Sequence, residues 1–285
     1  MDGLDVTIED WVRERPYLKE IAQLQKIIEA VIKKSGGEAV TPYVPGEGVL
    51  EEFKRGIPIL KTGENLEGFM KEVENLIVKM IDALVTASLP GQIITQSLQV
   101  KAAFAEKEDL VGCLVAEAVK DSSVKDSKKD LGEVSEGFLL FLVWKALSHV
   151  LEPLKEKVSM LLEEDPWLRG YCPVCGQLPA MAHLLKTEKG RERNLICGCC
   201  QMHWRFKRMG CPYCGNEDQK TLEIIGLDEE PDLRVDTCKE CEGYLKTYIG
   251  EGQELAALTD WSTLHLDLVA KKQGFKRIGY QMYGI

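Results

Sequence analysis

The chain has 285 residues, of which 45% are hydrophobic and 29% are charged, and its formal net charge at pH 7 is −10. This composition is ordinary for a globular protein, and the length allows one large core with a smaller unit, or two to three units. The excess of acidic residues argues against a general affinity for nucleic acid or for anionic membranes.

Neither a signal peptide nor a membrane span is predicted. The N-terminal stretch MDGLDVTIEDWVRERPYLKE lacks a basic region, an apolar region and a cleavage site made of small residues. The most apolar run, FLLFLVW at 138–144, has seven residues, whereas a helix needs about 20 to cross a bilayer. We therefore expect a cytoplasmic chain with no membrane insertion, in a compartment where thiols stay reduced.

The first 165 residues indicate helices. Apolar residues recur every three or four positions over 14–34 and 65–89, and shorter helices are predicted over 93–104 and 109–119. A long helix is predicted over 133–164, kinked or divided at Pro153. The Gly- and Pro-rich segment 35–53 is expected to be extended and packed over the helices, and the charged segment 121–130 is the candidate for a mobile loop. Cys113 is expected to be a small core residue.

The composition of the sequence changes after Asp165-Pro166, where cysteine, glycine and short β-like runs become frequent. Short strands in small hairpins are predicted at MAHLL, RNLIC, MHWRF, TLEIIGL, LRVDTC and YLKTYI. A last amphipathic helix is predicted over about 260–273, with Asp260 as its N-cap and Gly274 as its stop. The sequence thus predicts a multidomain α+β chain, with a helical domain at 1–166, a first β module at 167–209, and a second β module with the C-terminal helix at 210–285.

Eight of the ten cysteines form four CxxC pairs. Loops of 21 and 23 residues separate the first pair from the second and the third from the fourth, a spacing typical of tetrathiolate metal sites. Gly176 and Gly215 follow the second cysteine of CPVCG and CPYCG, where the chain must turn back, and Pro173 and Pro212 preset the turns. Two sequential sites are favoured over interleaved ones; their predicted ligands are Cys172, Cys175, Cys197 and Cys200, then Cys211, Cys214, Cys238 and Cys241.

Three interpretations of the cysteines compete: structural metal sites, disulfides and redox-active CxxC pairs. Four spaced pairs favour metal, the missing signal peptide disfavours disulfides, and redox chemistry normally uses one pair at a helix N-terminus. Four thiolates suit zinc and also iron, so we expect two metal ions, zinc or iron. Cys199 could replace Cys200 as a ligand or remain a free thiol. The hairpins have little apolar core and are not expected to fold without metal.

No catalytic group is predicted, and we expect a protein that is not an enzyme. The sequence lacks GxSxG, P-loop, GxGxxG and HExxH motifs, and its four histidines are scattered; His203 is expected to be a surface or hairpin residue. The stretch HWRFKR at 203–208 interleaves aromatic and cationic residues. It indicates either a nucleic-acid-binding surface or an amphipathic strand whose cations face water or the chain's own carboxylates.

The motifs YCPVCGQLPAMAHL, LICGCCQMHWRFKRMGCPYCG, CKECEGYLKTY and LDLVAKKQGFKRIG occur in an order that resembles the formate dehydrogenase accessory proteins of the FdhE type. The resemblance covers about 170–280 and extends more weakly to the helical half, including GIPIL at 56–60. It implies a helical domain followed by two rubredoxin-like, zinc-ribbon-like modules in which the eight cysteines hold iron or zinc. It also implies a maturation factor that binds the catalytic subunit of formate dehydrogenase during assembly.

Two other functions remain open from the sequence: a zinc-ribbon protein that binds nucleic acid, and a rubredoxin-like electron carrier. Under the maturation hypothesis, exposed aromatic residues near the ribbons would contact the partner, and Trp204, Tyr213 and Tyr244 are the candidates. The alternative for these three side chains is that they cover the small ribbon cores.

Overall fold

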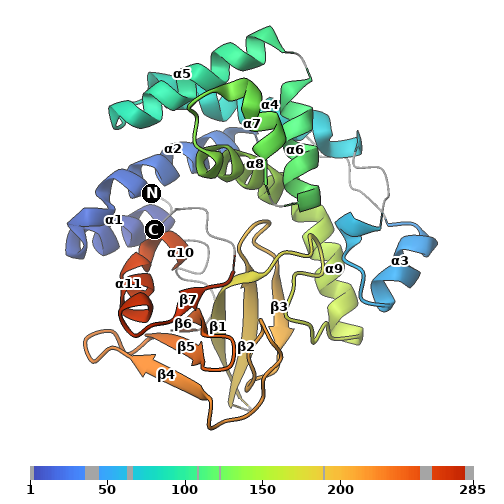
Figure 1. Cartoon of the computed structure of the whole chain (residues 1–285), viewed down its shortest axis with the longest axis vertical. Coiled ribbons are helices and arrows are strands. Elements are labelled where there is room, and N and C mark those ends of the chain that lie inside the picture. Colours follow the sequence, from blue (N-terminus) through green and yellow to red (C-terminus); the bar gives the residue numbers. More distant parts are fainter. Residues whose placement is uncertain are drawn as a thin grey trace.

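A layer of helices covers one end of a mixed β-sheet, and two short helices from the C-terminal part of the chain lie against the sheet (Figure 1). The computed structural model describes residues 3–35, 45–62, 67–107, 109–121, 123–188, 190–250 and 259–279. The helical part consists of α1 (Gly3–Glu14), α2 (Lys19–Ser35), α3 (Glu47–Lys54), α4 (Glu67–Thr86), α5 (Gly91–Glu106), α6 (Leu110–Asp121), α7 (Lys125–Lys128), α8 (Glu136–Val150) and α9 (Glu152–Glu164).

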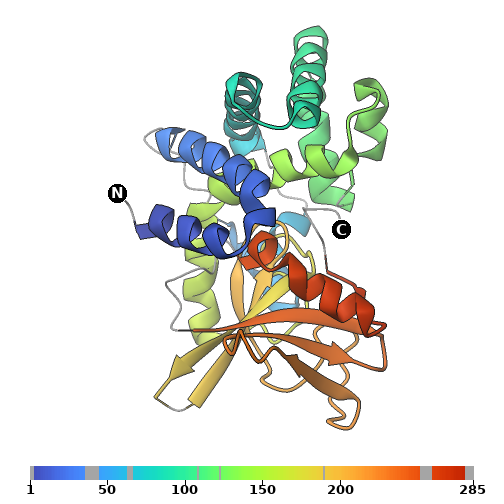
Figure 2. The ribbon, with the colours of Figure 1, turned by 90° about the vertical axis from the view of Figure 1, so that its left-hand side faces the viewer.

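The helix predicted over 14–34 corresponds to α2 and begins later than expected, and a helix that was not predicted, α1, precedes it. Helix α1 ends at Glu14, a short 3-10 turn covers Pro16–Leu18, and α2 begins at Lys19. The prediction of one helix from residue 14 was wrong because Pro16 has no N–H for a helix interior and is tolerated only in a first turn, which it occupies here. The two helices form part of one layer that contacts α10 and α11 (Figure 2).

Two segments expected to be irregular contain helices. Within 35–53, residues 47–53 belong to α3, and residues 36–44 lie outside the described part. Segment 121–130 contains α7 and the start of a 3-10 turn at Lys129–Leu131. Glu117 explains α7: its carboxylate accepts the backbone N–H groups of Asp126 and Ser127, both at 2.9 Å. The side chain of Val124 is fully buried and anchors the segment.

The long helix predicted over 133–164 divides as expected. Helix α8 ends at Val150, α9 begins at Glu152 with Pro153 in its first turn, and the two axes differ by 64°. Helix α8 is apolar around its circumference because it lies inside the core, where Trp144 is fully buried. Among the described residues, no single helix is both long enough and apolar enough to cross a membrane. Helices α8 and α9 meet these two criteria only when they are taken together as one segment, and that segment is bent.

In the part of the chain that the structure describes, the β half is one seven-stranded sheet. Its strands are β1 (Pro179–Thr187), β2 (Gly190–Cys197), β3 (His203–Phe206), β4 (Leu222–Gly226), β5 (Leu233–Cys238), β6 (Gly243–Gly250) and β7 (Lys276–Arg277). The order is β3-β2-β1-β6-β5-β4, with β7 pairing to β6. All neighbours are antiparallel except β1–β6 and β6–β7. The six strands predicted from sequence runs are confirmed.

The parallel pairing of β1 with β6 joins the two predicted β modules. Met181 lies opposite Lys246 and Leu185 opposite Gly250, so the first hairpin and the second share hydrogen bonds along one edge. The fold class, a helical N-terminal region followed by a β region that carries two groups of four cysteines and then a short C-terminal helix, is confirmed. The division into units at residues 166 and 209 stays a prediction.

A buried network of charges fixes the C-terminal helices, α10 (Thr259–Ser262) and α11 (Leu264–Lys272), to the sheet. The fully buried Lys246 lies 2.8 Å from a carboxylate oxygen of both Asp260 and Asp267. Arg277 pairs with the same two carboxylates, again at 2.8 Å, and the hydroxyl of Tyr244 donates to Asp267. The predicted role of Asp260 as an N-cap was therefore wrong: it lies within α10, and its carboxylate binds these two cations. The predicted stop at Gly274 is confirmed by its φ of +88°.

Removing the buried cation should destabilise the chain strongly. We expect Lys246→Met to lower the free energy of unfolding by about 3–5 kcal/mol, because it leaves two buried carboxylates with one cation between them. The matched control is Lys276→Met, which removes an exposed lysine paired with Glu242 and should change little. Urea unfolding followed by circular dichroism measures both; equal effects of the two substitutions would contradict the role given to the network.

Candidate metal centres

The first group of cysteines is closed and fully buried. Cys172, Cys175, Cys197 and Cys200 each have 0% exposure, and their sulfurs lie within 4.8 Å of one another. The sulfurs of Cys172 and Cys200 are 3.5 Å apart, and those of Cys175 and Cys197 are 3.4 Å apart. The first and second CxxC pairs therefore meet, as the sequential arrangement predicts.

The second group has the same plan but lies near the surface. The sulfurs of Cys211, Cys214, Cys238 and Cys241 also fall within 4.8 Å of one another. The Cys211–Cys241 and Cys214–Cys238 sulfur distances are both 3.7 Å. Cys214 is exposed and Cys241 half-buried, so solvent reaches this group and not the first.

The distances fit a metal ion better than they fit disulfides. Sulfurs about 2.3 Å from a tetrahedral ion lie about 3.8 Å from one another, whereas bonded sulfurs lie about 2.05 Å apart. The observed separations of 3.4–3.7 Å agree with the former, and all ten cysteines are free thiols here. Each group thus offers four sulfur ligands of the kind that zinc and iron accept.

The first and third CxxC turns share one backbone pattern. The N–H of Cys172 donates to the carbonyl of Gln177, and that of Gly176 donates back to Cys172. The same two bonds recur between Cys211 and Asn216 and between Gly215 and Cys211. Each pattern holds its two sulfurs on one side of the turn.

The residue after the second cysteine adopts a left-handed conformation in all four turns. Gly176 and Gly215 have φ of +78° and +76°, as their positions in the sequence predict. Gln201 and Glu242 hold the corresponding places in the second and fourth turns with φ of +61° and +56°. Neither residue is a glycine, so the left-handed conformation at these two places was not predictable from the sequence.

The environment favours one thiolate in each group. Burial raises the pKa of the thiols of Cys172 and Cys175 well above the usual range. Burial acts the same way on Cys197, but hydrogen bonds from the other three thiols and from Cys199 hold its pKa well below the usual range. In the second group, burial is outweighed at Cys238 by the backbone N–H groups of Cys241 and Glu240 and the amide of Asn216, which lower its pKa to about 7. The thiolate is the form that binds metal.

The first CxxC turn is fixed to the helical half by a short segment that follows α3. The N–H groups of Ile59 and Leu60 donate to the carbonyls of Pro173 and Val174, at 3.0 and 2.9 Å. The hydroxyl of Tyr171 donates to the carbonyl of Gly56 at 2.9 Å. On the other side, the hydroxyl of Ser148 in α8 donates to the carbonyl of Cys200. The sequence indicated no contact between GIPIL and a cysteine turn.

Several single-residue expectations are settled by burial. Trp204 and Tyr244 are 2% and 5% exposed and Tyr213 is half-buried, so the hypothesis that they form an exposed contact surface was wrong, and they cover the cores of the β half.

Cys113 is exposed on α6, which contradicts its expected core position. Cys199 is buried beside the first group but is not among its four members; its N–H donates to the sulfur of Cys197 at 3.3 Å.

The stretch HWRFKR forms an amphipathic strand. In β3, Trp204 and Phe206 face the core, while His203 and Arg205 are exposed. Arg205 pairs with Glu192 at 3.4 Å, and Lys207 pairs with Glu217. Two of the cations thus meet the chain's own carboxylates, and the aromatic rings are not available at the surface.

Comparison with known proteins gives one consistent result. No family model matches the chain. Curated relatives include a "Protein FdhE homolog" of Aquifex aeolicus (strain VF5), 30% identical over 154 residues, which are 53% of this chain and 54% of that protein. Another, from Haemophilus influenzae (strain PittGG), is 31% identical over 184 residues, 63% of this chain and 56% of that protein. The chain therefore spans about half the length of the curated relatives it matches.

A solved structure shares the fold. The crystal structure of the FdhE protein from Pseudomonas aeruginosa aligns with a TM-score of 0.64 and 21% identity, over 94% of this chain and 88% of that one. The alignment spans both the helical half and the β half, since neither alone makes up that share of the chain.

The difference in burial between the two groups should appear in metal release. With zinc bound, we expect a chromophoric chelator to remove one ion per chain at least about tenfold faster than the other, because the exposed group opens without unfolding the core. Cys214→Ser should remove the fast phase, and Cys175→Ser the slow one. Release of both ions in one phase would contradict this assignment.

Gly176 and Gly215, which end the CPVCG and CPYCG motifs, provide a matched pair of substitutions. Both have φ near +77°, so Gly215→Ala should lower the free energy of unfolding by about 1–2 kcal/mol. Gly176→Ala should cost more, because its added methyl would lie 3.1 Å from Cγ of Pro58, whereas nothing lies within 4 Å at Gly215. Urea unfolding of the metal-loaded variants tests this order; a larger loss for Gly215→Ala would refute it.

Proposed function

We propose that the chain is a member of the FdhE family, to which it is similar in sequence and fold, and that it is an accessory factor that binds the catalytic subunit of formate dehydrogenase during assembly. The proposal is supported by the sequence similarity to curated FdhE homologues and by the fold that the chain shares, over both halves, with one FdhE protein. The proposed role is in binding and maturation and not in catalysis.

We infer that the eight cysteines hold two structural metal ions, each zinc or iron. The supporting observation is that each group uses all four of its ligands on the protein, whereas catalytic zinc keeps one position for water or substrate. When bound, the ion would hold two distant CxxC turns together. In the first group it would also hold the contact between the β half and the segment after α3. Elemental analysis of protein purified without oxygen should give two ions per chain.

The functional test uses a bacterial host that lacks its own FdhE homologue and makes the formate dehydrogenase of the source organism. The chain should restore formate-dependent dye reduction and should co-purify with the catalytic subunit under anaerobic conditions. Cys175→Ser should reduce the restored activity by at least about tenfold, because a buried three-sulfur group leaves the first site open. Cys113→Ser is the matched control, since this cysteine is exposed and lies outside both groups.

Three outcomes would contradict the proposal. One is unrestored activity with no catalytic subunit recovered, although the chain carries two ions. Another is a red protein whose iron cycles reversibly between Fe(III) and Fe(II) and supports electron transfer, which would indicate an electron carrier. The third is tight, salt-sensitive binding of DNA or RNA.

A further inference from the structure

A groove rich in cations runs along β2 and β3 and the loop that follows β3. Its four exposed cations are Arg191, Arg205, Lys207 and Arg208, and we call it the basic groove. The hollow has a volume of about 920 Å³, and the exposed side chain of Leu168 also lines it. It lies outside both four-cysteine groups.

The charge of this groove is opposite to that of the whole chain. Five cations line it, the exposed four and the buried Arg193, against two carboxylates, Glu188 and Glu192, in a chain of net charge −10. Among the described residues, neither Arg191 nor Arg208 has a carboxylate partner. The groove therefore presents unneutralised positive charge, which attracts an acidic ligand.

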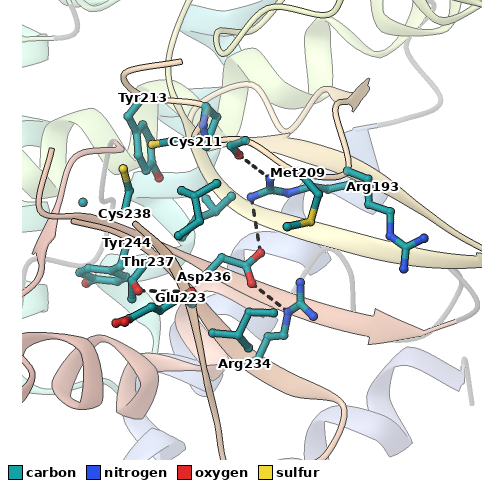
Figure 3. A pocket seen from close by; sticks show the side chains of 17 residues that line it. Arg193, Met209, Cys211, Tyr213, Glu223, Arg234, Asp236, Thr237, Cys238 and Tyr244 are labelled. Carbon is teal, nitrogen blue, oxygen red and sulfur yellow. Dashed lines mark hydrogen bonds and ion pairs between the residues drawn. The ribbon is translucent and has the colours of Figure 1, made fainter. Parts of the chain in front are cut away.

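A small apolar hollow adjoins the basic groove, and the two share Arg193 and Arg208 as lining residues. Figure 3 shows this hollow, with Met209 beside it and Cys211 and Cys238 of the second group at one end. Its volume of about 80 Å³ is of the size of one aliphatic side chain. Met209 and Ile224, both of which line it, are 48% and 58% exposed.

Partly buried ion pairs hold the wall between the two hollows in place. Arg193, which is 4% exposed, donates to the carbonyl of Gly210 at 2.8 Å and pairs with Asp236 at 3.4 Å. The other oxygen of Asp236 pairs with Arg234 at 2.9 Å, so one carboxylate lies between two guanidinium groups (Figure 3). Asp236 also accepts a hydrogen bond from the hydroxyl of Thr247, and this network fixes the apolar hollow next to an excess of positive charge.

We propose that the basic groove binds an extended acidic segment of a partner protein, with carboxylates facing Arg191 and Arg208 and one apolar side chain in the hollow beside Met209. Charge complementarity together with exposed apolar anchors is the combination that such a segment recognises. The inference goes beyond the proposed function, because the groove would bind a segment of this chemistry in any protein and not in formate dehydrogenase alone.

A nucleic acid fits the groove less well. Proteins that bind single strands stack bases on exposed aromatic rings, but Trp204 and Phe206 beside the groove are 2% and 8% exposed. The net charge of −10 also repels a nucleic acid at long range. This repulsion is weaker for a short acidic segment, because such a segment carries far less charge.

The test uses the full metal-loaded chain and a fluorescent peptide pool of about a dozen residues, in which Asp or Glu alternates with Leu, Met, Phe or Val. Fluorescence anisotropy at low salt should show saturable binding that weakens as salt is added. Arg191→Glu with Arg208→Glu should reduce the affinity at least about tenfold, and Met209→Ser should reduce it severalfold. Arg191→Gln with Arg208→Gln repeats the test if charge reversal impairs folding.

The matched control is Lys271→Glu with Lys272→Glu, which makes the same change in net charge at two exposed positions on α11. Compared at a salt concentration of about 0.15 M, where the Debye length is about 8 Å, it should leave the affinity within about twofold, since charges farther away than that are screened. Absence of saturable binding would overturn the proposal, as would equal losses in the groove variants and the control. Tighter binding of a single-stranded oligonucleotide of equal length, displaced by the peptide pool, would assign the groove to nucleic acid instead.

Discussion

The first four-cysteine group is the joint between the two halves of the molecule. Its first turn accepts backbone hydrogen bonds from Ile59 and Leu60, and its second accepts one from Ser148 of α8. These bonds exist only while the turns keep their shape, and that shape depends on four buried sulfurs staying together. Because the hydrophobic core runs without a break from α2 to these cysteines, the helical layer and the first β hairpin depend on the same joint.

The second group has a different place in the structure. It closes the loop between β3 and β4 against the end of β5, near the surface, and the helical half does not contribute to it. The chain just before the first group nevertheless packs against the third turn: a methyl group added at Gly170, two residues before the first group, would lie 1.7 Å from the carbonyl oxygen of Pro212. The first group thus connects the two halves of the molecule, whereas the second lies near the surface of the same sheet.

The local features of this fold could be read from the sequence, and the non-local ones could not. The CxxC turns, the six strands and the break at Pro153 follow from spacing, alternation and a residue without an N–H, which are all local signals. The exposure of Cys113 was also readable, since Leu110, Val111, Leu114, Val115 and Ala118 form the buried stripe and Cys113 lies off it. The contact of residues 56–60 with the first turn joins distant parts of the chain, and the capping of α7 by Glu117 depends on where the preceding helix ends and the chain turns back. Periodicity carries no information about such contacts.

The parallel pairing of β1 with β6 has a consequence for synthesis of the chain. Strand β1 is complete at Thr187, but its second neighbour does not begin until Gly243, and all four sulfurs of the first group precede that point. During translation the first hairpin can gain its ion while one flank of β1 still has bare amide and carbonyl groups, a state that invites pairing with other chains. The ribosome must add residues 188 to 250 before that flank is fully covered, and the growing polypeptide is open to aggregation over this interval.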